Sequence, residues 1–91
     1  MDVINFISDD KKLSKNINYH GNIKLYRVEV EFLSPDGVRM HKDVNTQPIQ
    51  YKNSSFKKAL TLFLCRNCTE QEINYMASFG AKLINVNGTK N

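Results

Sequence analysis

The sequence predicts a small α+β domain in which two helices pack on one face of a short, mostly antiparallel sheet. Apolar and polar side chains alternate through residues 23–44 on both sides of a Ser-Pro-Asp-Gly turn, as in the strands of a half-buried hairpin. Residues 56–64 and 70–79 show the apolar spacing of helices, and residues 81–86 form a short apolar run typical of a strand. The predicted order is therefore β-hairpin, helix, helix, strand.

The turn at residues 34–37 predicts the register of the hairpin. Its proline fixes the φ angle that the first central position of a type I turn requires. Its glycine can adopt the left-handed conformation of a bulge. This turn places Phe32 opposite Met40, whereas a slip of two residues would pair Glu31 with Arg39. Both registers bury the same face, and exposed cross-strand pairs contribute only about 0.2–1 kcal/mol each. We therefore predict the register that the turn defines.

The same alternation assigns each hairpin side chain to one face. The side chains predicted to face the core are Tyr26, Val28, Val30, Phe32, Val38, Met40, Lys42 and Val44. The polar face would hold Arg27, Glu29, Glu31, Arg39, His41 and Asp43, together with Leu25 and Leu33. Two leucines on this face add an apolar element to an otherwise charged surface.

Capping residues mark the start of both predicted helices. Asn53, Ser54 and Ser55 are good N-caps for a helix that begins near Phe56. Its buried face would contain Phe56, Ala59, Leu60, Phe63 and Leu64. Thr69 and Glu72 form a capping box for the second helix, which is expected to end at Gly80 in the left-handed conformation. That helix would bury Ile73, Met76 and Ala77, and the strand after it would end at Asn87-Gly88.

Length predicts a single domain, because 91 residues are too few for a second core. We divide the chain into a partly ordered N-terminal arm at 1–21, the α+β domain at 22–88 and a frayed tail at 89–91. No apolar run approaches the roughly 20 residues of a membrane span, and acidic N-terminal flanks are atypical of a secretory signal. We therefore expect a soluble, cytoplasmic protein with no membrane partner.

The net charge is modestly positive, since 13 Lys and Arg outnumber 9 Asp and Glu and give +4. Much of the excess lies between residues 21 and 58. A basic strip would consist of Lys42, Tyr51, Lys52, Lys57 and Lys58. Lysines at a helix N-terminus suit backbone phosphate, and a tyrosine can stack on a base. Nucleic-acid binding is therefore one hypothesis, although Glu29 and Glu31 would repel phosphate on the hairpin.

Cys65 and Cys68 are two cysteines at a spacing known from metal and redox sites. Zinc would need about two more ligands, and only His20 and His41 are available. Redox cysteines usually lie at a helix N-terminus, whereas Cys65 falls at the end of a predicted helix, where the dipole raises the thiol pKa. We expect Cys65 in the core and Cys68 in a linker, with no metal and no cofactor. A redox or zinc protein remains a minority hypothesis.

Catalytic motifs are also missing from the sequence. His41 lies beside carboxylates and can in principle serve as a general base, but mixed charges on the outer face of a hairpin are usually solvated surface. The chain has no recognisable nucleophile motif and no glycine-rich phosphate loop. We therefore expect no catalytic residues and no enzyme activity.

In size, and in a composition rich in Asn, Lys and Ile with three Arg and no Trp, the whole chain resembles small accessory proteins of AT-rich bacteriophages. The resemblance suggests a non-catalytic binding protein that inhibits or modulates a host macromolecule, as counter-defence proteins do. A host or viral protein is the expected partner, nucleic acid is the alternative, and an exposed sheet edge offers a route to a homodimer. The candidate binding surface comprises Lys42, Tyr51, Lys52, Lys57, Lys58, Arg27, Arg39, His41, Leu25 and Leu33.

Overall fold

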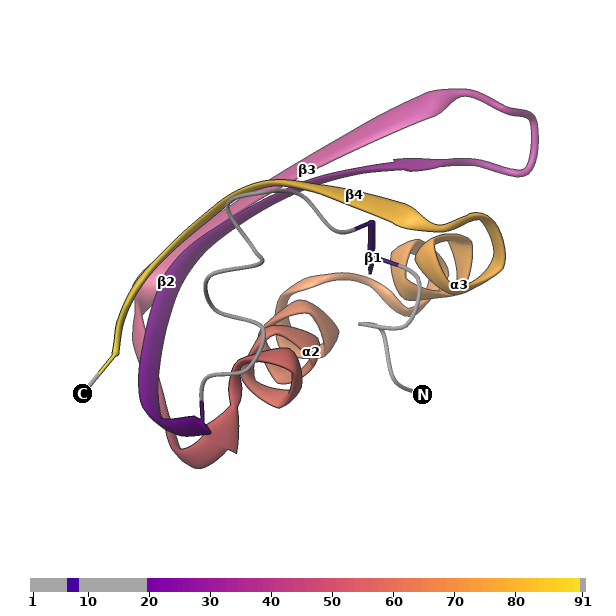
Figure 1. The fold of residues 1–91 in the computed structure, drawn as a ribbon. Helices are drawn as coiled ribbons and strands as arrows, with labels where there is room; N and C mark the ends of the chain where they lie inside the picture. The colour runs from indigo at the N-terminus through magenta and orange to yellow at the C-terminus, as the bar shows by residue number, and fades with distance from the viewer. Residues whose placement is uncertain (1–6, 9–19, 91) are drawn as a thin grey trace.

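The structure, a computed structural model, describes residues 7–8 and 20–90 and confirms the predicted α+β class. Its elements are β1 (Ile7–Ser8), β2 (His20–Leu33), β3 (Arg39–Ser55), α2 (Phe56–Asn67), α3 (Glu70–Phe79) and β4 (Ala81–Lys90). The strands form one sheet in the order β1-β4-β2-β3, in which only the short β1·β4 pairing is parallel. Figure 1 shows both helices on the concave side of a curved sheet.

The hairpin has the register that the turn predicts. Gly37 has a φ of 78°, and its N–H donates to the carbonyl oxygen of Ser34 over 2.9 Å. The N–H of Ser34 donates in turn to the carbonyl oxygen of Val38 over 2.9 Å. Phe32 consequently lies opposite Met40. The glycine bulge therefore decides between the two registers.

A bulge at Tyr26 corrects the predicted faces of β2. Leu25 pairs with Gly88 and Arg27 with Asn87, so Tyr26 has no partner in β4. One unpaired residue reverses the alternation, because side chains change faces with a period of two. Leu25 is therefore buried at 1% exposure and Tyr26 is 38% exposed, the opposite of the prediction. Leu25 accordingly leaves the candidate binding surface and joins the core.

The same position bends the sheet. On β3, residues 46–48 lie opposite Tyr26, between the pairs Leu25–Ile49 and Arg27–Asn45. Bulged strands bend and twist more strongly than regular ones. In Figure 1 the sheet curves around α2. The buried side chains of β2 thus come from both sides of the bend: Ile23, Leu25, Val28, Val30 and Phe32.

Both helices begin at the predicted caps. The hydroxyl of Ser55 accepts a hydrogen bond from the N–H of Lys58 at 3.1 Å, and Thr69 and Glu72 form the reciprocal capping box. The predicted buried face of α2 is confirmed in full. Gly80 has a positive φ of 83°, but its ψ of 164° is extended rather than left-handed helical, so the chain passes directly into β4.

The buried face of α3 is narrower than predicted. Ile73 and Met76 are buried as expected, whereas Ala77 is half-buried.

β4 is longer than predicted because Asn87-Gly88 does not end it. A Cβ atom at Gly88 would collide with the backbone carbonyl oxygen of Lys24 and lie 2.9 Å from Cδ2 of Leu25. Gly88 therefore permits a close approach of two strands rather than a turn, and β4 continues to Lys90. Of the predicted arm at 1–21, residues 7–8 form β1 and residues 20–21 belong to β2. The rest of that arm and Asn91 lie outside the described residues.

Replacement of Gly88 by alanine should therefore destabilise the fold. We expect Gly88→Ala to lower the free energy of unfolding by about 1–3 kcal/mol, because the added methyl group meets backbone that can move only by separating the strands. Urea unfolding at neutral pH measures the change, with Thr89→Ala at the exposed neighbouring position as the control. Equal stability of the two variants would show that β2 and β4 do not approach this closely.

Candidate functional site

The outer face of the sheet carries a polar network centred on Glu29. The guanidinium of Arg27 donates to both carboxylate oxygens of Asp43, through Nε at 3.0 Å and Nη2 at 2.9 Å. The Oε2 atom of Glu29 lies 2.6 Å from Nε2 of His41, and its Oε1 accepts from Nδ2 of Asn85 at 2.8 Å. Arg27 and Asp43 are diagonal neighbours, because Arg27 pairs directly with Asn45. A slip of two residues would also have placed Arg27 directly opposite Asp43, so the turn-defined register keeps this ion pair as a diagonal contact.

This network sets the ionisation of its carboxyl groups. Hydrogen bonds from Asn85 and then from His41 hold the pKa of Glu29 below its ordinary value of 4.5. The hydrogen bond from Arg27 lowers the pKa of Asp43 below 3.8, and the pKa of Arg27 is raised in return. The charged side chains of this network therefore largely compensate one another. His41 contacts a carboxylate as a general base would, but here that contact belongs to a satisfied surface network.

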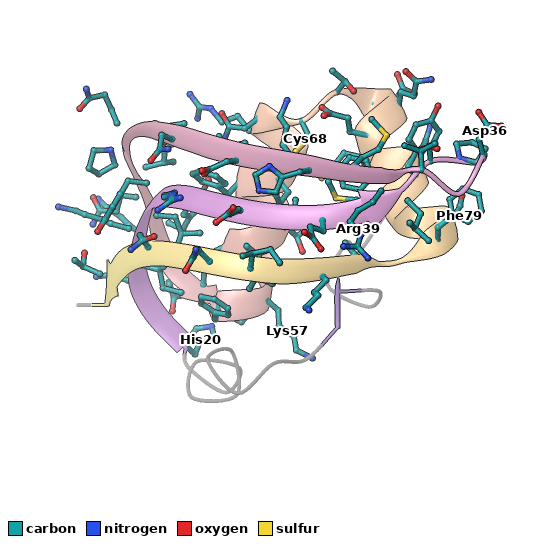
Figure 2. All side chains as sticks on the ribbon, turned by 90° about the horizontal axis from the view of Figure 1, so that it is seen from above. His20, Asp36, Arg39, Lys57, Cys68 and Phe79 are labelled. Atoms are coloured by element: carbon teal, nitrogen blue, oxygen red, sulfur yellow. The ribbon has the colours of Figure 1, made fainter. Side chains whose placement is uncertain are left out.

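A shallow groove of about 300 Å³ lies at the hairpin end of the sheet. Its lining includes Glu31, Leu33, Arg39, Phe79 and Lys82. Figure 2 shows Arg39 and Phe79 near one another, close to the turn that carries Asp36. Leu33 is 42% exposed and Phe79 is 48% exposed, which is high for large apolar side chains. The groove therefore combines an exposed apolar surface with two cations and one carboxylate.

The ends of four elements build this groove: β2, β3, α3 and β4. β2 ends at Leu33, which lies opposite Arg39, and Glu31 lies opposite Lys82 of β4. α3 ends at Phe79, and the positive φ of the next residue carries the chain straight into the sheet. The prediction included Leu33 and Arg39 but missed Phe79 and Lys82. An aromatic residue directly before a helix-ending glycine was the available signal, but only the tertiary fold brings it beside the hairpin.

The predicted basic strip is divided between different surroundings. Nζ of Lys42 lies 3.2 Å from Oε1 of Glu72, so this lysine bonds to α3. Tyr51 is half-buried, and burial raises its pKa. Its hydroxyl oxygen is buried and has no hydrogen-bond partner among the described residues. The remaining lysines of the strip are exposed: Lys52, Lys57 and Lys58.

The prediction for Cys65 is wrong, because its side chain is exposed, whereas Cys68 lies in the linker between α2 and α3 as predicted, with its side chain half-buried. Cys65 is exposed, because it follows Leu64 at the edge of the buried stripe of α2. Cys68 caps that helix through its N–H, which donates to the carbonyl oxygen of Leu64 at 2.8 Å, and it packs against the core. Burial raises the pKa of the Cys68 thiol to about 11, which disfavours the thiolate that metal or redox chemistry requires. Within residues 7–8 and 20–90, no group of three or more His, Cys, Asp or Glu could hold a metal ion.

Comparisons with protein-family models, with curated proteins and with solved structures found no match. None of the helices in the described part of the chain has the length and apolar character needed to cross a bilayer.

The Glu29 network should make stability depend on acid pH. The folded-state pKa values of Glu29 and Asp43 lie below the ordinary 4.5 and 3.8, so their contribution is present above these values and is lost as pH falls through the lower folded-state values. We expect Glu29→Gln to reduce the loss of unfolding free energy between about pH 5 and pH 2. Urea unfolding across this range measures it.

Glu31→Gln is the matched control, because Glu31 lies on the same strand and face but takes no part in the described network. This variant should keep the acid dependence of the unmodified protein. If the acid dependence of the unfolding free energy decreases equally in both variants, it reflects the total charge of the protein rather than these hydrogen bonds.

Proposed function

We propose that the protein is a small non-catalytic binding protein that modulates or inhibits a host or viral protein by covering its surface. In this proposal, the hairpin-end groove is the surface that binds the partner. The observation that supports it is the combination, in one groove, of exposed apolar side chains and cations without a matching number of anions.

The apolar part of the groove suits a protein partner. Single exposed leucines are common, but Leu33 and Phe79 line one groove. Val38, which was predicted to face the core, is instead 60% exposed beside the hairpin turn. Aromatic side chains and arginines are the residues most often found at the centre of protein interfaces. Phe79 and Arg39 fit that description, and Figure 2 shows them together. Phe79 is therefore the expected anchor.

The charge of the groove favours an acidic partner. Glu31 lies opposite Lys82 in the sheet, so these two side chains can compensate each other. Arg39 has no ion pair with another described residue. An exposed guanidinium beside apolar side chains favours a segment with an apolar side chain next to a carboxylate. We therefore propose an acidic, apolar segment of another protein as the partner.

Nucleic-acid binding is the second candidate. Lys57 and Lys58 lie in the first turn of α2, and with Lys52 they are exposed, with no ion pair to another described residue. Lysine side chains in the first turn of a helix can contact the phosphate groups of a nucleic-acid backbone. The burial of the Tyr51 hydroxyl and the bond between Lys42 and Glu72 reduce the strip to these three lysines.

One binding experiment distinguishes the two candidates. The tagged protein is incubated with native-host extract, with and without nuclease, and the affinity for the captured partner is then measured by calorimetry. We expect capture to survive nuclease, and Phe79→Ala to weaken binding at least about tenfold, as truncation of a central aromatic anchor does. Leu62→Ala is the matched control, because it shortens another exposed apolar side chain, on α2.

The triple change of Lys52, Lys57 and Lys58 to Gln completes the design. It should leave the affinity for the protein partner unchanged. Loss of capture with nuclease, together with loss of binding in the triple variant, would instead support nucleic acid. Nucleic-acid affinity should then fall steeply with salt, and the triple change should flatten that slope by up to about 2–3 units.

A further inference from the structure

The open edge of the sheet is a second surface with a defined chemistry. Among the described strands β3 lies at one end of the order β1-β4-β2-β3, so only β2 pairs with it. An edge strand presents unpaired N–H and C=O groups, which can bind another strand. We propose that residues Arg39–Asn45 of β3 bind the same segment of a second copy, antiparallel, and join two sheets into one. This proposal goes beyond the proposed function, because it rests on the backbone of β3 rather than on the groove, although both surfaces include the side chain of Arg39.

The hydrogen bonds of the turn show which backbone groups are free. Ser34 and Val38 form a hydrogen-bonded pair, through the N–H of Ser34. Pairs in an antiparallel ladder alternate between hydrogen-bonded and non-hydrogen-bonded types, and no register shift interrupts β2·β3 between the turn and Arg27. The residues of β3 in non-hydrogen-bonded pairs direct their N–H and C=O groups away from β2. These residues are Arg39, His41, Asp43 and Asn45.

The length of this free edge is limited on both sides. The hairpin turn precedes Arg39, and the irregular segment at 46–48, with a proline that lacks an N–H, follows Asn45. Bulges and prolines are the usual means by which edge strands avoid unlimited pairing. A straight segment between such features favours a closed pair over a fibre. A two-fold dimer satisfies this restriction because each copy uses the same segment.

The charge pattern selects one register for the pair. Antiparallel pairing centred on His41 places Arg39 opposite Asp43 of the second copy, twice by symmetry. A register centred on Lys42 would place two lysines opposite each other, and one centred on Asp43 would oppose two carboxylates; like charges directly opposite are destabilising. Arg39 is free of ion pairs with the described residues. Asp43 accepts two hydrogen bonds from Arg27, and a carboxylate can accept about four.

The proposal is tested by sedimentation equilibrium from micromolar to millimolar protein. We expect the mass to rise with concentration from the 10.5 kDa of one chain toward twice that value. His41→Pro removes an edge N–H without removing a bond to β2, so this variant should stay monomeric. His41→Ala is the matched control: it loses the same contact with Glu29 but keeps its N–H, and it should still dimerise.

A charge reversal tests the register. Arg39→Glu places two carboxylates opposite each other at both ends of the pair, and it should raise the dimer dissociation constant at least about tenfold. Lys57→Glu makes the same change of charge away from β3 and should leave the constant unchanged. If circular dichroism shows that His41→Pro does not fold, the effect of Arg39→Glu on the dissociation constant still tests whether β3 forms the dimer interface. A monomer at every concentration, a folded His41→Pro variant that dimerises, or equal effects of the two reversals would overturn the proposal.

Discussion

The bulge at Tyr26 is the constraint on which the rest of this fold depends. With regular alternation, Ile23 and Leu25 would lie on the same face as Arg27 and Glu29, and the first half of β2 would expose its apolar side chains. The unpaired residue returns both to the core, where each is only 1% exposed. Full burial of such a side chain stabilises by about 1.5–3 kcal/mol, which is large for a domain of this size. The associated bend lets one sheet enclose α2 (Figure 1).

The charged residues on the outer face of the hairpin have two different kinds of surroundings. Around Glu29, away from the ends of the strands, cross-strand and diagonal neighbours satisfy one another, and the carboxyl groups have lowered pKa values. At the hairpin end, Arg39 forms no ion pair with another described residue and lines a groove with Phe79 (Figure 2). The side chains at the centre of the outer face thus bind one another, whereas the hairpin end and the β3 edge are the surfaces that we propose bind other chains.

Much of the fold could be predicted because its signals are local. The caps at Ser55 and Thr69, the buried stripe of α2 and the glycine bulge of the hairpin each depend on a few neighbouring residues. The faces of Leu25 and Tyr26 could not be read in the same way, because a pattern of period two cannot show where one residue is skipped. The role of Gly88 also depends on a strand distant in sequence.

The candidate site was predictable only in part for the same reason. Leu33 and Arg39 belong to the hairpin and could be assigned to its outer face. Phe79 and Lys82 join them only because α3 and β4 return to the hairpin end. Cys65 was misplaced because the pattern did not show that the buried stripe of α2 ends at Leu64. The linker position of Cys68 was predicted, but its packing against the core was not.

The position of β4 has a consequence for the order of assembly. β4 is last along the chain but lies inside the sheet, between β1 and β2. The hairpin and the two helices each form from residues close in sequence, whereas β4 must close a loop that spans both helices before it meets β2. β1 pairs with β4 at Ala81 and Lys82, so the first of the described strands depends for its described pairing on the last one. Sequence separation therefore favours assembly from the β2·β3 hairpin at one edge of the sheet toward β1 at the other.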